Sequence, residues 1–253
     1  MVVCYAQPEK AKSRLVLEAF AAGCAGRMAS TTARQLEPGG AAFYGVRPPW
    51  RHLWAQAKLE RRTVYFLDNA WFDAGRERFF RVGVNAVQSW SPRPSDGKRL
   101  AALGVRVQPW RWDGRHIVVC PQSDEFMATV AGRPNWLAEV LREIATRTDR
   151  LVVVRKKGAP RPLRADLHGA WLLVAHSSAA AVEALLAGVP VIVTDPSCAM
   201  AAFGSSFSNL ETGTRRPDGR EEWAARLADS QFTLNEMRDG TAWRAYQGND
   251  MDG

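Results

Sequence analysis

Residues 171–195, WLLVAHSSAAAVEALLAGVPVIVTD, decide the fold class that the sequence predicts. The apolar run at 171–175 is too short for an independent helix and is typical of a buried parallel strand. Residues 179–187 are rich in strong helix formers, and Gly188 is of the type that commonly ends a helix. A second apolar run, 189–194, predicts another buried strand. Strand, helix and strand form a βαβ unit, which favours an α/β fold with a parallel sheet.

Three small polar residues, His176, Ser177 and Ser178, separate the first strand from the helix. The right-handed crossover of a βαβ unit places such a loop at the carboxyl edge of the sheet, where α/β proteins bind ligands. Ser177 or Ser178 is expected to be the N-cap of the helix. Because the first turn of a helix offers unpaired N–H groups and a partial positive charge, this loop suits a phosphate group.

Arg155, Lys156 and Lys157 directly follow another apolar run, 151–154, one βα step before His176. Cations at the carboxyl end of a strand can neutralise a diphosphate group. Alternate residues of an extended chain point to the same side, so Arg155 and Lys157 are the expected pair. A solvated basic turn is the alternative interpretation.

Residues 151–196 resemble the donor-nucleotide segment of GT-B glycosyltransferases, in which a strand leads to H-S/G-S and the next helix carries a Glu before AGVPVI. Capsule-building transferases and the nonhydrolysing UDP-N-acetylglucosamine 2-epimerases share this layout. The resemblance implies that His176, Ser177 and Ser178 lie under the diphosphate. It also implies that Glu183 holds the ribose of the nucleotide.

With 253 residues the chain has room for two domains of ordinary size. The resemblance implies an α/β, GT-B-like architecture: two Rossmann-like domains whose parallel sheets face each other across a cleft. We expect an acceptor-binding domain at 1–110, a nucleotide-sugar-binding domain at 111–219, and C-terminal helices at 220–253 that return towards the first domain. The chain departs from the family at residues 6–8, where AQP replaces the usual glycine-rich loop.

Apolar and amphipathic runs predict the remaining elements. Strands are expected at 1–6, 41–46, 63–67, 79–87, 105–109 and 116–121. Helices are expected at 9–22, 50–59, 98–103, 136–146, 163–169, 220–230 and 240–246, with the helical pattern extended over 232–237. Residues 196–219, rich in Ser, Gly, Thr and Pro, are expected to form a surface loop that crosses the cleft.

The formal charge of +8 is unevenly distributed. Residues 1–115 contain 19 Lys or Arg and 9 Asp or Glu, whereas residues 116–253 contain 15 and 17. An excess of +10 in the half that is not expected to bind the nucleotide indicates a polyanionic partner, and double-stranded DNA is the first candidate. A solvated basic surface is the alternative.

Four residues of the basic half are expected to contact DNA: Arg61, Arg62, Trp71 and Arg111. Arg111 belongs to WRWDGR, residues 110–115, which interleaves aromatic and cationic side chains. Such a mixture can stack bases or hold a nucleic-acid backbone. Packing is the alternative, since tryptophans near a domain junction commonly serve it.

Asp68 stands at the carboxyl end of the strand expected at 63–67. A carboxylate at this position in the acceptor half suits a general base that removes a proton from an acceptor hydroxyl. Asp73 is the second candidate for this catalytic role. Alternatively, Asp68 and Asn69 cap a following turn.

Cys4, Cys24, Cys120 and Cys198 have neither the spacing of a metal site nor the density of a disulfide framework, so a reduced, cytoplasmic protein is expected. No apolar run reaches the length of a membrane span, and the N-terminus lacks a signal-peptide pattern. Because side-chain cations are expected to neutralise the donor, no metal and no cofactor are expected besides the nucleotide-sugar co-substrate.

The sequence thus predicts a glycosyltransferase that moves a sugar from a nucleotide sugar to a hydroxyl acceptor. A hydroxymethylated pyrimidine in DNA is the first candidate acceptor, as in the class of virus-encoded transferases that includes bacteriophage enzymes. A capsule or cell-wall glycan, or a lipid-linked sugar, is the competing acceptor. A non-catalytic nucleotide- or nucleic-acid-binding module and a nucleotide-sugar epimerase are the alternative functions. The sugar, the anomeric outcome and the oligomeric state stay open.

Overall fold

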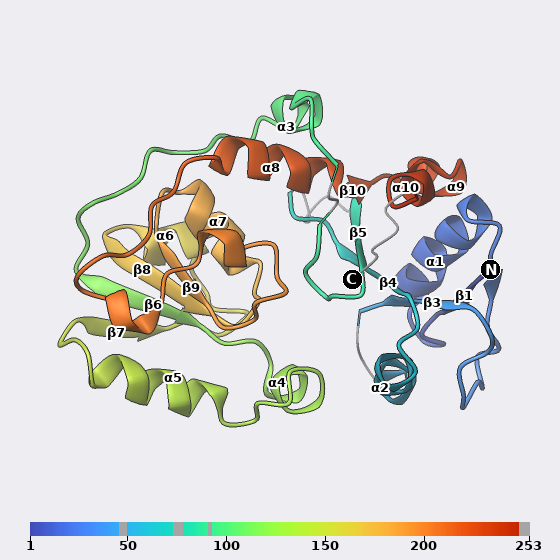
Figure 1. The fold of residues 1–253 in the computed structure, drawn as a ribbon, viewed down its shortest axis with the longest axis horizontal. Helices are drawn as coiled ribbons and strands as arrows, with labels where there is room; N and C mark the ends of the chain where they lie inside the picture. The colour runs from blue at the N-terminus through green and yellow to red at the C-terminus, as the bar shows by residue number, and fades with distance from the viewer. Residues whose placement is uncertain (46–49, 73–77, 91–92, 248–253) are drawn as a thin grey trace. The chain divides into compact units, whose positions relative to one another are not determined.

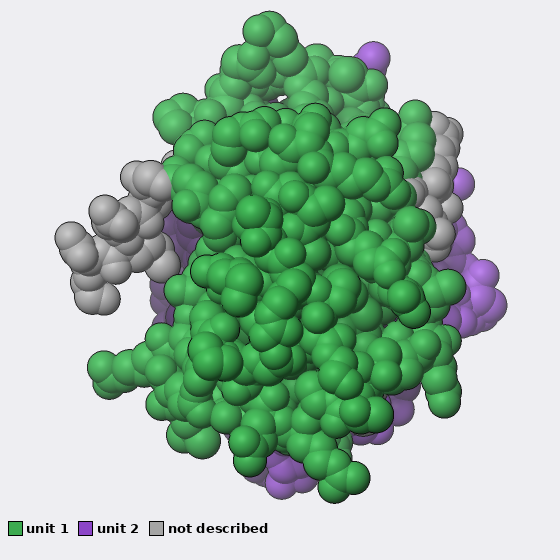
Figure 2. Space-filling model, turned by 90° about the vertical axis from the view of Figure 1, so that its right-hand side faces the viewer, with its two compact units in different colours: residues 1–105, 225–253 green, residues 106–224 purple. Residues whose placement is uncertain are grey.

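The computed structural model describes residues 1–45, 50–72, 78–90 and 93–247. The chain divides into two compact units, which Figure 2 colours separately. Unit 1 consists of Met1–Val105 together with Ala225–Gly253, and unit 2 consists of Arg106–Ala224. The chain therefore leaves unit 1, forms all of unit 2 and returns to unit 1.

Unit 1 is built on a six-stranded sheet in the order β10-β5-β4-β3-β1-β2 (Figure 1). Its strands are β1 (Val2–Tyr5), β2 (Arg27–Met28), β3 (Gly40–Tyr44), β4 (Val64–Asn69), β5 (Phe80–Val84) and β10 (Gln231–Phe232). The first four strands are parallel, whereas β5 runs antiparallel to β4 and β10 runs antiparallel to β5. Unit 1 is thus an α/β unit with a mainly parallel sheet, in which β5 is the reversed strand.

Helices cover both faces of this sheet, which is why its strands are apolar at nearly every position. The helices of unit 1 are α1 (Ala11–Gly23), α2 (Arg51–Leu59), α3 (Lys98–Ala102), α9 (Leu234–Arg238) and α10 (Thr241–Arg244). In β1, Val2 and Cys4 belong to the core shared with α1, α9 and α10, whereas Val3 and Tyr5 belong to the core shared with α2. A Cβ on Gly23 would lie 1.9 Å from the carbonyl oxygen of Met237, so glycine permits the close approach of α1 and α9.

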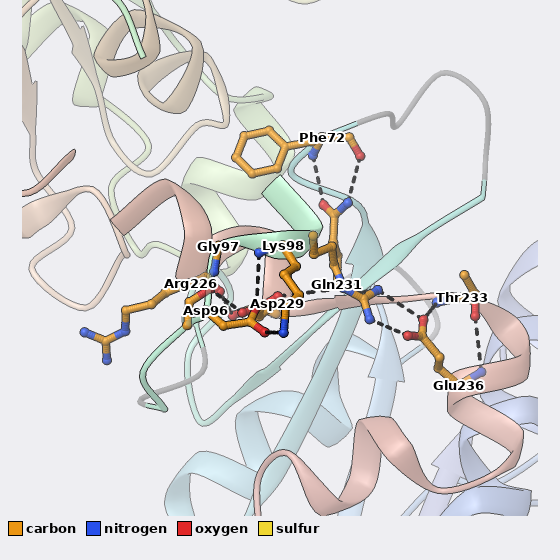
Figure 3. A network of polar contacts seen from close by, with 12 residues as sticks. Phe72, Asp96, Gly97, Lys98, Arg226, Asp229, Gln231, Thr233 and Glu236 are labelled. Atoms are coloured by element: carbon orange, nitrogen blue, oxygen red, sulfur yellow. Dashed lines mark hydrogen bonds and ion pairs between the residues drawn. The ribbon is translucent and has the colours of Figure 1, made fainter. Parts of the chain in front are cut away.

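Polar contacts of Arg99 and Gln231 fasten the returning C-terminal segment to unit 1 (Figure 3). The buried side-chain amide of Gln231 accepts the N–H of Phe72 at 3.0 Å and donates to its carbonyl at 3.2 Å. Arg99 pairs with Glu236 and donates to the carbonyl of Gln231 at 3.0 Å. Thr233 and Glu236 form a capping box that begins α9. The helix expected over 232–237 is therefore wrong at its start, because the preceding residues pair with β5 as β10.

Unit 2 is built on a four-stranded parallel sheet in the order β7-β6-β8-β9. Its strands are β6 (His116–Cys120), β7 (Leu151–Val154), β8 (Ala170–Ala175) and β9 (Val191–Val193). Its helices are α4 (Asp124–Thr129), α5 (Trp136–Ala145), α6 (Leu163–Leu167), α7 (Ala180–Leu186) and α8 (Arg220–Asp229), which continues into unit 1. Figure 1 shows α5 along one face of the sheet and α6 and α7 along the other. The βαβ unit expected over 171–195 is confirmed as β8, α7 and β9.

Two expectations near unit 2 are wrong. Residues 105–109 form no strand, because Gln108 and Arg111 direct their N–H groups to the carbonyls of Leu186 and Gly188, at 2.7 and 2.8 Å. The segment 196–219 is not only a surface loop. It contains two 3-10 turns, η2 (Ala201–Phe203) and η3 (Phe207–Asn209), and it buries several apolar side chains: Cys198, Ala199, Met200, Phe203 and Leu210.

The charge asymmetry is smaller between the units than between the sequence halves. Unit 1 has 19 basic and 13 acidic residues, a net +6, and unit 2 has 15 and 13, a net +2. The difference has two equal sources: residues 225–253, with a net charge of −2, belong to unit 1, and residues 106–115, with a net charge of +2, belong to unit 2. Ion pairs further neutralise basic residues of this unit: Arg14–Glu18, Arg27–Glu37, Arg62–Glu60, Arg81–Asp68, Lys98–Asp96 and Arg99–Glu236.

Within the described ranges, no helix has the length and apolarity that a bilayer crossing demands.

Candidate functional site

The carboxyl edge of the unit 2 sheet brings the predicted donor residues together. The chain adds β7 on one side of β6 and then β8 on the other side, so the topological switch point lies at the ends of β6 and β8. Ligands of open α/β sheets bind at such a point. The residues that follow the strand ends there are Gln122, Arg155, His176 and Thr194.

His176 is buried and held in a hydrogen-bonded chain with Thr194 and Trp136. Trp136 donates its indole N–H to Thr194 Oγ1 at 2.8 Å, and Thr194 Oγ1 lies 2.9 Å from His176 Nδ1. Burial lowers the pKa of His176; Asp195 opposes this effect and Arg133 reinforces it. The ring is therefore neutral at pH 7. The Thr194 hydroxyl thus contacts both the indole N–H of Trp136 and the imidazole of His176.

Ser177 and Ser178 position the loop between β8 and α7. The backbone N–H and hydroxyl of Ser177 lie 3.1 and 3.2 Å from Gln122 Oε1, at the switch point. Ser178 accepts the N–H of Ala180 on its hydroxyl at 3.3 Å, although the N-cap position itself falls to Ala179. Among the described residues, this leaves the N–H groups of Ser178 and Ala179 without an acceptor. Two adjacent N–H groups of this kind suit an anionic oxygen.

Arg155 is held at the end of β7 by a buried carboxylate. Asp166, whose side chain is 3% exposed, pairs with Arg155 and also with Arg161 at 2.5 Å. Arg155 Nη2 donates to the carbonyl of Arg161 at 2.5 Å. One carboxylate, that of Asp166, thus serves two guanidinium groups.

Glu183 belongs to the first turn of α7 and is accessible to solvent. The surrounding protein desolvates its carboxyl and raises its pKa, and the charge of Arg155 opposes this effect. The buried thiol of Cys120, at the end of β6, is influenced electrostatically by both Arg155 and Glu183. The end of β6, Arg155 and Glu183 therefore share one corner of the sheet edge.

Lys157, the expected partner of Arg155, is exposed in the turn after β7. The prediction that Lys157 points to the same side as Arg155 assumed an extended chain, but β7 ends at Val154, before both residues. No group of three or more His, Cys, Asp or Glu side chains is arranged to hold a metal in the part of the chain that the structure describes. The only D-x-D sequence, at residues 250–252, lies outside that part.

Asp68 in unit 1 is the partner of a buried arginine. It lies in β4, one residue before the end of the strand and opposite Arg81 of β5. Arg81 Nη2 lies 2.7 Å from Asp68 Oδ2, and the side chains of Arg81 and Asp68 are 5% and 30% exposed. The other carboxylate oxygen accepts the N–H of Asn69 at 2.8 Å. Trp71 is buried with Arg81 stacked 4.4 Å from its ring centroid, so its ring is not presented to a DNA surface. Asp73, the second candidate base, lies outside the described residues.

The other residues expected at a DNA surface have different environments. Arg61 is exposed and has a positive φ of 51°. Arg62 pairs with Glu60 at 2.5 Å. Arg111 lies in unit 2 and donates to the carbonyl of Leu167 at 2.8 Å. Arg61 and Arg62 are therefore in unit 1 and Arg111 is in the other unit.

The carboxyl edge of the unit 1 sheet holds a polar group that the sequence did not single out. Asn69 Oδ1 accepts from Lys12 at 2.8 Å and from the hydroxyl of Tyr44 at 2.9 Å. The side chain of Gln7, which follows β1, donates to the carbonyl of Tyr44 at 3.3 Å. One sequence signal could have found this group: Tyr44 and Asn69 end parallel strands, and Gln7 follows another. This polar group is a candidate binding surface of unit 1.

No established protein family and no curated protein sequence matches the chain. Among solved structures, it is similar to the beta Kdo 2,4 transferase of KpsC from Thermosulfurimonas dismutans, with 14% identity, a TM-score of 0.50, and coverage of 89% of this chain and 90% of that chain. The beta Kdo 2,7 transferase of the same KpsC is 12% identical with a TM-score of 0.47, over 96% of this chain and 99% of that chain. The likeness to the 2,4 transferase is one of fold, and it agrees with the expected α/β class with parallel sheets.

Proposed function

We propose that this protein is a glycosyltransferase that takes a sugar from a nucleotide-sugar donor, and that unit 2 binds the nucleotide at the carboxyl edge of its sheet. One observation carries this proposal: Arg155, the free N–H groups of Ser178 and Ala179, and the carboxyl of Glu183 all belong to one edge of unit 2. A cation, paired amides and an accessible carboxylate are the groups that phosphate and ribose require.

In the proposed reaction the bond between the sugar and the donor phosphate breaks, and the phosphate leaves with an additional negative charge. Arg155 and the amides of Ser178 and Ala179 would stabilise that charge, because they are oriented before the reaction begins. Asp166 keeps Arg155 in place and at the same time pairs with Arg161. Lys157, in the adjacent exposed turn, would add a flexible cation.

Two further side chains complete the proposed donor site. Glu183 would accept hydrogen bonds from the ribose hydroxyls, which requires its ionised form. His176 would donate to a phosphate oxygen from Nε2 in the tautomer that carries its proton there. Its partner Thr194 holds the ring at Nδ1.

We further propose the two-domain GT-B arrangement, with unit 1 supplying the acceptor side. Asp68 is a weak choice for the general base, because both of its oxygens already accept hydrogen bonds. We therefore assign Asp68 the role of positioning Arg81. Asp73 stays the candidate base.

For the acceptor, we favour an acidic glycan. The structural neighbour with the higher TM-score is named for its action with Kdo, a sugar that carries a carboxylate. The net charge of +6 on unit 1 suits such an acceptor. The same charge favours hydroxymethylated DNA, so this acceptor is the second candidate.

Calorimetry with CMP, UDP, GDP and ADP, and with the corresponding sugar nucleotides, tests the donor site. At least one nucleotide should bind, and the Glu183→Ala variant should bind it more weakly. If none of them binds, the assignment of unit 2 as the donor unit is wrong.

Mass spectrometry tests the acceptor. The protein would be incubated with the bound sugar nucleotide and, separately, with an oligosaccharide that ends in a carboxylated sugar and with hydroxymethylated DNA. A mass increase of one sugar on the oligosaccharide supports the glycan acceptor. An increase on DNA alone would support the second candidate, and no increase on either would contradict the proposed activity.

A further inference from the structure

Trp112 is unusually exposed. It has 73% of its surface accessible, and the other strongly exposed large apolar side chains among the described residues are all aliphatic: Met1, Leu15, Leu59, Leu151 and Val154. An exposed indole ring offers a flat apolar face and an N–H donor to a partner. Trp112 is therefore a candidate for contact with a ligand.

The ring of Trp112 is supported on one face by Arg216, whose guanidinium carbon lies 4.4 Å from the ring centroid. Arg216 is itself held by Nε, which donates to the carbonyl of Arg111 at 2.7 Å, and by Nη1, which donates to the carbonyl of Thr214 at 3.0 Å. Arg216 also lies 5.4 Å from the ring centroid of Trp171. The support under Trp112 is thus fixed by several contacts, and the exposed ring has a defined place.

Arg216 keeps its positive charge without a carboxylate partner among the described residues. Its Nε and Nη1 bond to uncharged oxygens, and no acceptor of the described chain is bonded to Nη2. The neighbouring Arg150 differs, because it forms two hydrogen bonds with Glu211, at 2.7 and 2.9 Å. Trp112 and Arg216 together form what we call the Trp112 surface, which combines an open aromatic face with a cation that has no carboxylate partner among the described residues.

This surface lies away from the proposed nucleotide site within unit 2. Gly114 packs directly on the backbone where β8 begins, since a Cβ there would lie 2.4 Å from the N of Trp171. Trp112 is thus near the amino edge of the sheet, whereas His176 follows β8 at the carboxyl edge. A ligand at Trp112 would be held at a distance from the donor nucleotide.

We propose that Trp112 and Arg216 form a docking subsite for one ring of a carboxylated glycan. The apolar C–H face of a sugar ring would stack on the free face of Trp112, and the unmatched positive charge of Arg216 beneath the ring would attract the carboxylate of the sugar. A polymer bound at this point would be retained between successive transfer events. The choice of a glycan as occupant rests on the proposed glycosyltransferase function.

The structure favours a glycan over a single-stranded nucleic acid. Nucleic-acid strands are bound by a series of aromatic platforms on which successive bases stack, along a cationic groove. Here Trp110 and Trp171 donate their indole N–H groups to the carbonyls of Pro217 and Leu210 and are covered by Arg220 and Arg150. One available ring next to one unmatched cation fits a single acidic sugar.

The test uses full-length protein with ¹⁵N-labelled tryptophan. The indole N–H resonance of Trp112 is assigned as the signal that the Trp112→Phe variant lacks. Hexagalacturonate, maltohexaose and hexathymidylate are then titrated separately. The Trp112 signal should shift to saturation with hexagalacturonate, whereas the neutral maltohexaose should bind about tenfold more weakly or worse, because it has no carboxylate for Arg216.

Calorimetry with hexagalacturonate measures the contribution of the ring. Trp112→Ala should weaken binding about tenfold or more, whereas Trp112→Phe, which keeps an aromatic face, should weaken it less. Leu59→Ala, which also truncates a strongly exposed apolar side chain, should leave the affinity unchanged. An unshifted Trp112 signal, an unchanged affinity of Trp112→Ala, or equally tight binding of hexathymidylate at Trp112 would overturn the proposal. Nucleotide binding, measured on the same samples, separates this failure from failure of the proposed donor site.

Discussion

The carboxyl edges of the two sheets both hold an arginine at a strand end, but the two arginines have different surroundings. In unit 1, buried Arg81 is matched by one carboxylate, Asp68, across neighbouring antiparallel strands. In unit 2, Asp166 is shared by Arg155 and Arg161, so neither arginine has this carboxylate to itself. An arginine with a carboxylate of its own stabilises the fold, whereas an arginine that shares its carboxylate can also attract an anionic ligand. The number of arginines per carboxylate thus separates a structural arginine from a candidate binding arginine.

The largest expected effect is the loss of the balanced pair. Asp68→Asn should lower the free energy of unfolding by about 3 kcal/mol, because it leaves the buried Arg81 guanidinium without a counter-charge. Urea unfolding measures this change, and the affinity for the donor nucleotide should stay the same.

Arg14→Gln is the control for that variant, because the Arg14–Glu18 pair in the same unit is exposed. It should change the free energy of unfolding by less than about 0.5 kcal/mol. If Asp68→Asn lowers the free energy of unfolding by less than about 1 kcal/mol, the Asp68 carboxylate is not needed to stabilise the buried Arg81 guanidinium.

Removing Arg155, the arginine that shares its carboxylate, should affect nucleotide binding instead of stability. Arg155→Ala should weaken nucleotide affinity about ten- to a hundredfold, since a charged hydrogen bond contributes about 1.5–3 kcal/mol. Asp166 would keep its pair with Arg161, so the fold should be retained. Calorimetry measures the affinity, and Arg142→Ala, at the far end of α5 from this edge, is the control. Equal affinities of the two variants would contradict the assignment of Arg155 to the donor site.

A smaller effect is expected from the chain that holds His176. Thr194→Val keeps the shape of the side chain but leaves the indole N–H of the buried Trp136 without its acceptor. The free energy of unfolding should fall by about 1.5 kcal/mol. Thr146→Val removes an exposed hydroxyl that bonds to the carbonyl of Glu143, and it should have almost no effect. If the two valine variants unfold at the same urea concentration, the Trp136–Thr194 bond is unimportant for stability.

The smallest effect concerns pH. The pKa of Glu183 is raised in the folded state, so the folded protein holds this proton more tightly than the unfolded chain does. Its contribution is fully present below the unfolded pKa and is lost as pH rises through the folded pKa. Glu183→Gln should therefore be slightly more stable than the natural protein at neutral pH, and the difference should disappear below about pH 4. Thermal unfolding across this range checks the sign. A difference that grows towards low pH would contradict it.

Local pattern predicted most elements because strands covered on both faces are nearly continuous apolar runs. The runs at 116–121, 151–154 and 171–175 correspond to β6, β7 and β8. Short elements were missed, since β2 and β10 have two residues each and too few positions to show a period. The strand expected at 105–109 was wrong for a different reason: its N–H groups bond to the end of α7 and to Gly188 instead of to a strand.

The sequence by itself determined that unit 2 has a βαβ segment and that His176, Ser177, Ser178 and Arg155 lie at one sheet edge. These features follow from apolar runs and from the order of strands, which are local properties. Only the tertiary structure decided which charges are matched, because Asp166, Arg81 and the C-terminal segment reach their partners through chain folding rather than through periodicity. It also decided that Trp71 is buried while Trp112 is exposed, since the exposure of a tryptophan depends on what packs against it and not on its neighbours in sequence.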